Sequence, residues 1–443
     1  MNPKKIGILV GGGPAPGINS VIGAATIRSA LHGSEVVGIL DGFKWLMQGD
    51  VSHTKELTIE NVSRIHFRGG SHIGISRENP TKNPNDLEKV VSSLLRLNID
   101  KLITIGGDDT AYSAHRVEQI ADGRIRVVHV PKTIDNDLDL PHGICTFGFQ
   151  TARHIGVDIV KNLMVDAKTT SRWYFVITMG RKAGHLALGI GKAAGATLTI
   201  VPEEFDDKNK LTMDKLVDIT VGAIIKRLSY DRPDGVGIFA EGLVEHMSEE
   251  DLKSLVSVER DAHDNIRIAE INFGEILKEK VQQRLASFNI KATVVAKNIG
   301  YELRCADPIP FDMEYTRDLG YCAAKFVHEG GNAAMVSIQE GQFVPLYFND
   351  IMDPKTGRTR VRMVDINSES YHIASRYMIR LSDTDFDDPN ELAKYAATAG
   401  ISMEEFEAKF RYIARNNKVN YHANGELMDQ DEKAAKKSKA KNA

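Results

Sequence analysis

The chain has 443 residues, of which 42% are hydrophobic and 26% are charged. This composition is typical of a soluble globular protein and excludes disordered, collagen-like and membrane-spanning classes. The 56 lysine and arginine residues and 60 aspartate and glutamate residues give a net charge of −4, which argues against nucleic acid as a main partner. At about 100–200 residues per domain, the length predicts about two or three domains.

The sequence shows no export signal. Lys4 and Lys5 precede an apolar run that stops at Gly11, which is too short for the apolar part of a secretory signal. Nowhere do about 18 consecutive apolar residues occur, so we expect no membrane span. The three cysteines form no CxxC pair and, being odd in number, no disulfide framework. We therefore expect a cytoplasmic protein without a membrane partner.

Short β-branched runs alternate with longer amphipathic segments along the chain, which is typical of βα units on a parallel sheet. The predicted strands are 6–10, 36–40, 101–105, 126–130, 173–178, 197–201, 236–240, 292–296 and 334–338. The predicted helices are 18–31, 86–97, 110–121, 148–165, 184–194, 212–228, 268–287 and 314–329. Gly33 and Asn98 stand where helix ends of left-handed conformation are expected.

About nine predicted strands are more than one typical sheet holds. We therefore predict an α/β fold with two doubly wound, Rossmann-like domains. Residues 431–443 are rich in lysine and lack large apolar side chains. We expect them to form a disordered, solvated tail rather than a basic binding arm.

Several predicted strands end in loops of unusual composition. In an open α/β sheet the ligand lies beyond the carboxyl ends of the strands, so these loops are where a site is expected. They read GGGPAPG at 11–17, GGDDT at 106–110, PKTIDND at 131–137 and MGR at 179–181.

The glycine-rich loop at 11–17 suits a bound anion. Glycine lets backbone N–H groups approach a phosphate, and the helix that follows adds favourable partial charge. A tight βα turn without a ligand would explain the same glycines. A dinucleotide fingerprint fails by spacing, because Pro16 stands where glycine is needed, although Asp41 lies near the position of a ribose-binding acid. A P-loop fails at Gly191-Lys192, where Ala193 follows.

Two acidic motifs follow neighbouring strands. Asp108, where an extended strand meets a helix, is well placed for Mg²⁺ shared with substrate phosphates, although helix capping is an alternative. Asp135 and Asp137 would point the same way if the backbone between them is extended, and close acids perturb each other's pKa. One of them would then be a general base, with Asx turn chemistry as the alternative.

These motifs, in this order and at these separations, resemble the phosphofructokinase family: GGGPAPGIN, GGDDT, PKTIDND, MGRKAG and GYELR. The resemblance runs from about residue 5 to residue 376 and is strongest to the pyrophosphate-dependent or mixed-substrate branch. It implies a phosphoryl-donor domain of residues 1–148 with about 300–365. It also implies a fructose 6-phosphate domain of residues 149–299 with about 366–430.

The resemblance implies roles for particular residues. Asp108 would hold Mg²⁺, and Asp135 would take the proton of the sugar 1-hydroxyl with support from Asp137. Arg77 would contact the transferred phosphoryl group, and Lys132 would neutralise charge on the phosphates. The donor would be bound by Gly12, Gly107, Asp109 and Thr110. The sugar phosphate would be bound by Thr133, Ile134, Met179, Gly180, Arg181, Glu241, Tyr301 and Arg304, and by Arg172 of a neighbouring subunit.

Asp109 and Lys132 stand where the ATP-using members of the family have glycine. Asp109 would place bulk and negative charge where the α-phosphate of a nucleotide runs, and Lys132 would bring a cation to the leaving phosphate of a short donor. Pro14, where ATP-using members often have an acid, fits the same remodelling. The alternatives are a salt-bridged surface lysine at 132 and an N-cap at 109.

We therefore expect a Mg²⁺-dependent enzyme of glycolysis that phosphorylates fructose 6-phosphate to fructose 1,6-bisphosphate with pyrophosphate, as a homodimer or homotetramer. An ATP-dependent phosphofructokinase is the first alternative. A non-catalytic, sugar-phosphate-binding regulatory subunit is an alternative of another class, but the acids and the lysine that such a subunit could lose are all present.

Overall fold

The computed structural model describes residues 5–141, 143–206, 211–247, 251, 272–353 and 359–415. The chain forms two compact units. The first comprises Met1–Met213, Asp234–Lys280 and Thr293–Met378, and the second comprises Asp214–Pro233, Val281–Ala292 and Ile379–Ala443. Each unit is described by itself below.

The first unit contains an eight-stranded sheet in the order β12-β11-β5-β4-β1-β2-β3, with β6 paired to β5. Strands β11, β5, β4, β1 and β2 are parallel, whereas β3 and β12 are antiparallel to their neighbours. The bounds are β1 Lys5–Val10, β2 Val36–Ile39, β3 Thr54–Leu57, β4 Ile99–Gly106, β5 Arg126–Thr133, β6 Phe147–Gly148, β11 Ala334–Gln339 and β12 Gln342–Tyr347.

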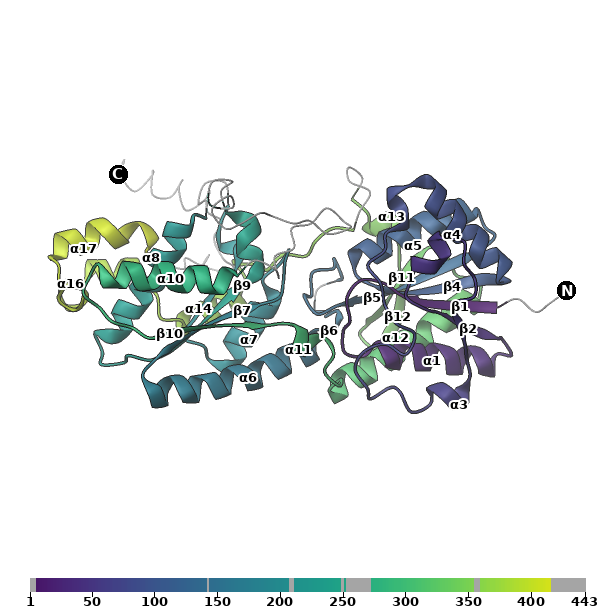
Figure 1. The fold of residues 1–443 in the computed structure, drawn as a ribbon, viewed down its shortest axis with the longest axis horizontal. Helices are drawn as coiled ribbons and strands as arrows, with labels where there is room; N and C mark the ends of the chain where they lie inside the picture. The colour runs from purple at the N-terminus through teal and green to yellow at the C-terminus, as the bar shows by residue number, and fades with distance from the viewer. Residues whose placement is uncertain are drawn as a thin grey trace, which may run out of the picture. The chain divides into compact units, whose positions relative to one another are not determined.

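Helices cover both faces of this sheet because its central strands are apolar on both sides. Ile8 of β1 faces one core and Leu9 faces the other, as the alternation along a strand requires. Helices α1 (Ile18–Leu31) and α12 (Pro310–His328) pack on the first face, and α4 (Pro84–Arg96) and α5 (Asp108–Ala121) on the second (Figure 1). Because β1, β4 and β5 are adjacent and parallel, their carboxyl ends are neighbours at one edge of the sheet.

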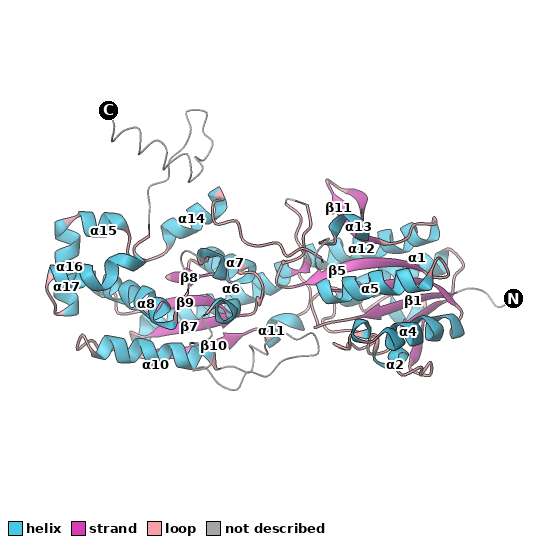
Figure 2. Ribbon diagram, turned by 90° about the horizontal axis from the view of Figure 1, so that it is seen from above, coloured by secondary structure: helices cyan, strands magenta, loops and turns pink. Residues whose placement is uncertain are grey.

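A second, four-stranded parallel sheet has the order β10-β7-β9-β8 (Figure 2). Its strands are β7 Trp173–Thr178, β8 Leu198–Ile200, β9 Gly235–Ala240 and β10 Val294–Ile299. Helices α6 (Phe149–Thr170) and α7 (His185–Ala194) share a core with Val176 and Ile238. Gly235 packs on the Trp173 ring, where an added Cβ would lie 2.6 Å from ring carbons. A larger residue would therefore displace the buried tryptophan.

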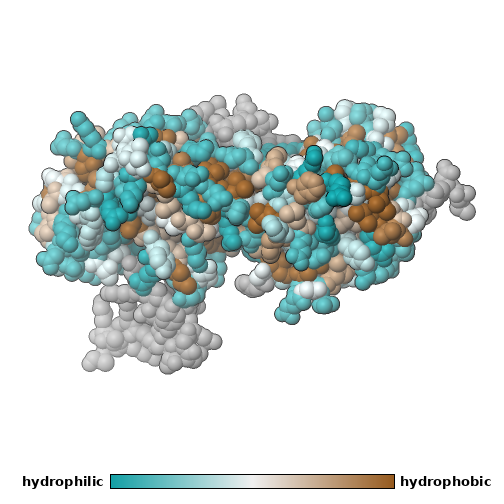
Figure 3. All heavy atoms as spheres, turned by 90° about the horizontal axis from the view of Figure 1, so that it is seen from below, coloured by the Kyte–Doolittle hydropathy of each residue, from teal (hydrophilic) through white to brown (hydrophobic). Residues whose placement is uncertain are grey.

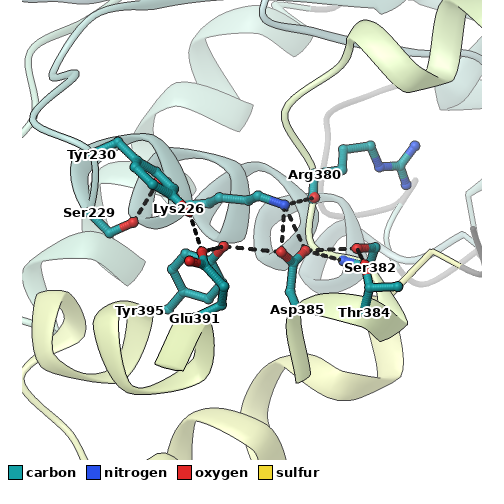
Figure 4. A network of polar contacts seen from close by, with 9 residues as sticks. All are labelled: Lys226, Ser229, Tyr230, Arg380, Ser382, Thr384, Asp385, Glu391 and Tyr395. Atoms are coloured by element: carbon teal, nitrogen blue, oxygen red, sulfur yellow. Dashed lines mark hydrogen bonds and ion pairs between the residues drawn. The ribbon is translucent and has the colours of Figure 1, made fainter. Parts of the chain in front are cut away.

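The second unit is helical. It contains α15 (Asp383–Asp387), α16 (Pro389–Ala399) and α17 (Met403–Phe410). Lys226 Nζ lies 2.6 Å from Asp385 Oδ2, and the Tyr395 hydroxyl is hydrogen-bonded to Asp385 and to Glu391 (Figure 4). Because Asp385 and Lys226 are mostly buried, this network fixes α15 against α8 (Met213–Leu228).

The remaining elements are longer helices at the unit boundaries and short helical turns. Helices α8 (Met213–Leu228) and α10 (Phe273–Ala286) contribute residues to both units. The others are α2 Lys44–Met47, α3 Ile59–Val62, α11 Tyr301–Arg304, α13 Phe348–Ile351 and α14 Glu369–Tyr377. None of the helices in the described part of the chain has the length and apolar content of a membrane span. The face drawn in Figure 3 carries separate groups of apolar residues among hydrophilic ones.

The predicted α/β class with two sheets is confirmed, and each predicted strand and helix has its counterpart with ends shifted by a few residues. Gly33 and Asn98 have φ values of 78° and 62°, as predicted for helix ends. The predicted helical residues 268–271 and the predicted tail 431–443 lie outside the described residues. Both sheets belong to the first unit, so the division into a donor domain and a sugar domain stays a prediction.

Candidate active site

The loops after β1, β4 and β5 lie at one edge of the first sheet, because these strands are parallel neighbours. Loops from the ends of β7, β9 and β10 approach the same place. Lys182 forms an ion pair with Asp108, and the charges of Arg304 and Glu241 act on Asp135. Sequence motifs that are far apart in the chain thus form a single polar cluster within the first unit.

The glycine-rich loop after β1 lies close to two positively charged side chains, those of Lys132 and Arg304. Gly12 has a φ of 84°, and a Cβ there would lie 3.4 Å from Lys132 Nζ. A Cβ on Gly13 would lie 3.5 Å from Arg304 Cζ. Lys132 Nζ also donates a hydrogen bond to the carbonyl oxygen of Gly13. The loop therefore brings its backbone to two positive charges, which suits an anionic ligand.

Lys132 is buried, with 5% of its surface exposed, so the alternative of a salt-bridged surface lysine is wrong. Burial and the nearby Arg304 cation lower the pKa of Lys132 to about 8, although Asp135 acts in the opposite direction. Arg77 is exposed, but its charge also acts on Lys132. A buried lysine among cations binds a negatively charged ligand strongly, because the ligand supplies the missing counter-charge.

The GGDDT motif forms the start of α5. Gly107 precedes the helix, and Asp108 and Asp109 occupy its first turn, where negative charge is favourable. Thr110 packs beneath the strand end, since a Cβ on Gly106 would lie 2.3 Å from Thr110 Cβ. The glycine at 106 is required by this close approach.

Asp108 is paired with Lys182. One carboxylate oxygen accepts the backbone N–H of Asp109 at 2.8 Å, and the other bonds Lys182 Nζ. Burial would raise the pKa of Asp108, but the Lys182 cation outweighs it and holds that pKa below its ordinary value. The alternative of helix capping is wrong for both acids, because the N-cap of α5 is Gly107 and no side chain makes a capping hydrogen bond there.

A magnesium ion fits this carboxylate. Mg²⁺ commonly binds one or two protein carboxylates and takes its other ligands from phosphates and water. Among the described residues, no three His, Cys, Asp or Glu side chains gather around a common point. Asp108 would thus be a single protein ligand, and the magnesium ion would take its other ligands from a phosphorylated substrate and from water.

The acids of the PKTIDND motif are close to each other, but not through an extended backbone. Asn136 between them has a φ of 57°, so the expectation of an extended segment is wrong. Burial, and then the Glu241 charge, raise the pKa of Asp135 to about 6, although Arg304 opposes this. Burial, and then the Asp135 charge, raise the pKa of Asp137 to about 7. A carboxylate with such a pKa accepts a proton near neutral pH.

Thr133 and Ile134 shape this loop. Thr133 Oγ1 accepts the backbone N–H of Asp135 at 3.0 Å. Ile134 is 5% exposed and packs in the core, so its side chain anchors the loop. The position of Asp135 is therefore fixed by a hydrogen bond to its backbone and by the buried side chain of the residue before it.

The loop after β7 contributes Met179, Gly180 and Arg181. Gly180 has a φ of 127°, and its N–H donates to Glu241 Oε1 at 3.3 Å. Burial raises the pKa of Glu241, while Arg304 lowers it. Met179 is buried directly beneath Gly300. Its side chain therefore supports the loop that leads to Arg304.

One predicted residue, Arg172, lies apart from this cluster, and another, Tyr301, lies at its exposed rim. Arg172 precedes β7 at the opposite end of the strand, with its Nε 3.9 Å from Asp166 Oδ2. Tyr301 is 68% exposed, and its ring centroid lies 5.7 Å from Arg304 Cζ. Lys182 and Arg362 also belong to the cluster but were not predicted from the sequence. Lys182 could have been found because it directly follows Arg181 in the MGRKAG motif, whereas no motif marks Arg362.

Comparisons with known proteins identify the family of the chain. The chain matches the family model described as phosphofructokinase over residues 5–327. Two relatives are named pyrophosphate–fructose 6-phosphate 1-phosphotransferase. The one from Naegleria fowleri is 50% identical over 422 residues, covering 94% of this chain and 97% of the relative. The one from Thermotoga maritima is 52% identical over 412 residues, covering 92% of this chain and 98% of the relative.

A solved structure has the same fold. It is titled pyrophosphate-dependent phosphofructokinase from Nitrosospira multiformis, and the TM-score is 0.64 at 16% sequence identity. The match covers 97% of this chain and 98% of that chain.

Proposed function

Because the chain belongs to the phosphofructokinase family, we propose that it transfers a phosphoryl group from pyrophosphate to the 1-hydroxyl of fructose 6-phosphate. The products are fructose 1,6-bisphosphate and inorganic phosphate. The observation that carries the choice of donor is the buried Lys132, held by its bond to the Gly13 carbonyl at the glycine-rich loop.

In this proposal Asp135 is the general base. It takes the proton of the 1-hydroxyl, whose oxygen attacks one phosphorus of pyrophosphate while the bond from that phosphorus to the bridging oxygen breaks. The raised pKa of Asp135, about 6, suits a group that accepts a proton near neutral pH. Asp137 supports the base through its charge. Phosphoryl transfer otherwise depends on positioning and charge neutralisation.

The donor would lie between the glycine-rich loop and α5. Gly12, Gly107 and Thr110 would bind its phosphates, Arg77 would contact the transferred phosphoryl group, and Lys132 would neutralise the charge that develops on the leaving phosphate. Asp109 adds negative charge beside the donor, which disfavours the longer phosphate chain of a nucleotide. Asp108 would hold Mg²⁺, which neutralises donor charge when bound.

The sugar phosphate would lie between the loops that follow β5, β7, β9 and β10. Glu241 would accept hydrogen bonds from sugar hydroxyls, and Arg304 and Tyr301 would bind the phosphate. Thr133, Ile134, Met179, Gly180 and Arg181 would complete this part of the site. Arg172 would extend into the site of a neighbouring copy, so the proposal includes a homodimer or homotetramer, in the cytoplasm.

The test compares donors directly. The purified enzyme is supplied with fructose 6-phosphate and either pyrophosphate or ATP at equal free Mg²⁺, and fructose 1,6-bisphosphate formation is followed. The proposal requires kcat/KM for pyrophosphate to exceed that for ATP. A preference for ATP would assign the chain to the nucleotide-dependent branch, and turnover with neither donor would contradict an enzymatic role.

A further inference from the structure

The segment 361–364 lies beside the loop that carries the acids Asp135 and Asp137. Leu138 and Val361 form an antiparallel β-bridge, and the Arg362 N–H donates to the Asp137 carbonyl at 2.8 Å. In the sequence, this segment comes after all strands of the second sheet and after β11 and β12 of the first sheet. It returns to the first sheet beside the candidate base.

The Arg362 side chain enters the loop and uses its whole guanidinium group there. Nε and one terminal nitrogen donate to the Asn136 carbonyl at 3.2 and 3.1 Å, and the same terminal nitrogen bonds Asn136 Oδ1. The other terminal nitrogen donates to the carbonyls of Leu140 and Ile144 at 3.4 and 2.7 Å. A planar fork with fixed donors can satisfy these acceptors together.

The residue held in this way is the one between the two acids. Asn136 has a φ of 57°, a conformation that asparagine tolerates better than most residues but that still needs support. Its Oδ1 also accepts the N–H of Thr146 at 3.0 Å, and the Thr146 hydroxyl donates to the Thr133 carbonyl at 2.7 Å. The direction of both neighbouring carboxylates therefore depends on these contacts.

The same segment is fixed to the loop after β7. The Arg362 carbonyl accepts a hydrogen bond from His185 Nε2 at 3.0 Å, at the first residue of α7. Glu203 Oε1 accepts the N–H of Val364 at 3.0 Å and that of Gly184 at 2.8 Å. The segment thus joins the loop of the base to the loop that presents Arg181.

We propose that Arg362 is a positioning residue for phosphoryl transfer, holding Asn136 so that Asp135 and Asp137 face the reacting atoms. The inference rests on the proposed function in taking Asp135 as the base. Arg362 acts through Asn136 and the loop carbonyls. Its loss should therefore lower kcat and leave the binding of the sugar phosphate nearly unchanged.

The test compares Arg362→Lys with a matched control in the same segment, Arg360→Lys. Arg360 is exposed, and its nearest acid is Asp139, at 4.0 Å. We expect Arg362→Lys to lower kcat by about 10–100-fold with little change in KM for fructose 6-phosphate, because lysine keeps the charge but loses the fork. Arg360→Lys should match the parent. Added guanidinium chloride, compared with equal sodium chloride, should restore part of kcat to Arg362→Ala.

The inference is overturned if Arg362→Lys retains the parental kcat, or if both lysine variants lose activity equally. It also fails if KM rises as much as kcat falls. If the Arg362 variants do not fold, Asn136→Gly decides, since glycine accepts the positive φ and removes the side chain whose Oδ1 bonds Arg362 and Thr146. A parental kcat in that variant contradicts the inference. Rates are measured with pyrophosphate and with ATP. If the parent uses only ATP, the proposed donor is refuted, but kcat of the Arg362 variants can still be compared with that of the parent.

Discussion

Lys182 and Asp108 form an ion pair that joins the loop after β7 to the first turn of α5. The two residues are 74 positions apart in the sequence, and both side chains are largely buried, at 23% and 20% exposed. The pair brings the second sheet's loop to the carboxylate that we propose as the Mg²⁺ ligand. The stability of the folded chain and the assembly of the site therefore depend on the same contact.

Replacing Lys182 with Met should destabilise the protein at pH 7 by about 1–3 kcal/mol, because a largely buried carboxylate loses its partner. Lys182 holds the pKa of Asp108 below its unfolded value, so the pair's stabilisation is present at neutral pH and disappears as the pH falls through that lowered pKa. Urea unfolding at pH 7 and at about pH 2, below the unfolded pKa of an aspartate, measures both effects. Lys192→Met, at an exposed lysine on α7, is the control; an equal loss in both variants would exclude the ion pair as the cause.

Replacing Asp135 with Ser should lower kcat by about 10²–10⁴-fold with a much smaller change in KM for the sugar, because a general base acts mainly in the transition state. In the parent, kcat should fall as the pH drops below about 6, where Asp135 becomes protonated. Steady-state kinetics from about pH 5 to about pH 8, on both sides of the pKa of Asp135, test this. Asp139→Ser, at an exposed acid in the same loop, is the control, and near-parental kcat in Asp135→Ser would show that another group takes the proton.

Replacing Asp137 with Asn should raise stability at pH 8 and have little effect on stability near pH 4. Burial and the Asp135 charge raise the pKa of Asp137 to about 7 in the folded state, above its unfolded value. The folded carboxyl is therefore favoured while protonated, and that contribution is lost as the pH rises through 7. A neutral asparagine removes this cost, by about 1–3 kcal/mol at pH 8. Thermal unfolding at both pH values provides the measurement; a variant less stable than the parent at pH 8 would contradict this assignment.

A shared site between subunits predicts complementation. Arg172 lies away from the cluster formed by its own chain, and we propose that it binds the sugar phosphate of a neighbouring copy. Mixing Arg172→Ala subunits with Asp135→Ser subunits should form hybrids in which some sites have both residues intact. Activity above the sum of the two parents is the expected result. Hybrids that form without this gain would place Arg172 outside the site.

Donor choice should change when both charged residues beside the donor are replaced. Asp109→Gly removes bulk and negative charge, so ATP use should rise. Lys132→Gly removes a cation, so kcat with pyrophosphate should fall. The attraction between one such cation and a phosphate charge at ~4 Å is worth roughly 4 kcal/mol before desolvation. The double variant should shift kcat/KM toward ATP by at least about 10-fold, with non-additive effects, since we propose that both residues contact one donor. Kinetics with both donors on the parent and the three variants measure this. An unchanged donor ratio in a folded double variant would exclude these residues as the selector.

The sequence predicts regular elements well where hydrophobic periodicity is strong. The β-branched runs of β1 and β7 and the apolar face of α4 are buried as their patterns indicate. Helices α14–α17 follow residue 368 in a part of the chain where we identified no motif, and they were not predicted. Pro310 at the first turn of α12 is a start signal that the prediction at 314–329 did not use.

The site could be predicted only as far as its motifs extend. Asp108, Lys132 and Asp135 lie at the ends of parallel strands, so strand order brings them together. The contact between Lys182 and Asp108 and that between Arg362 and Asn136 join segments 74 and 226 positions apart. Such contacts depend on tertiary packing, and no local pattern encodes them. The left-handed Asn136 was missed because two acids separated by one residue also fit an extended strand.

The most direct test of pyrophosphate-linked transfer is the reverse reaction. The enzyme is incubated with fructose 1,6-bisphosphate, inorganic phosphate and Mg²⁺ without any nucleotide, and the products are followed by ³¹P NMR. Because phosphate itself would be the acceptor, pyrophosphate and fructose 6-phosphate should form together in equal amounts, and Asp135→Ser should slow the appearance of both signals by about 10²–10⁴-fold. An enzyme that turns over fructose 6-phosphate with ATP but forms no pyrophosphate in this experiment would contradict the proposed donor.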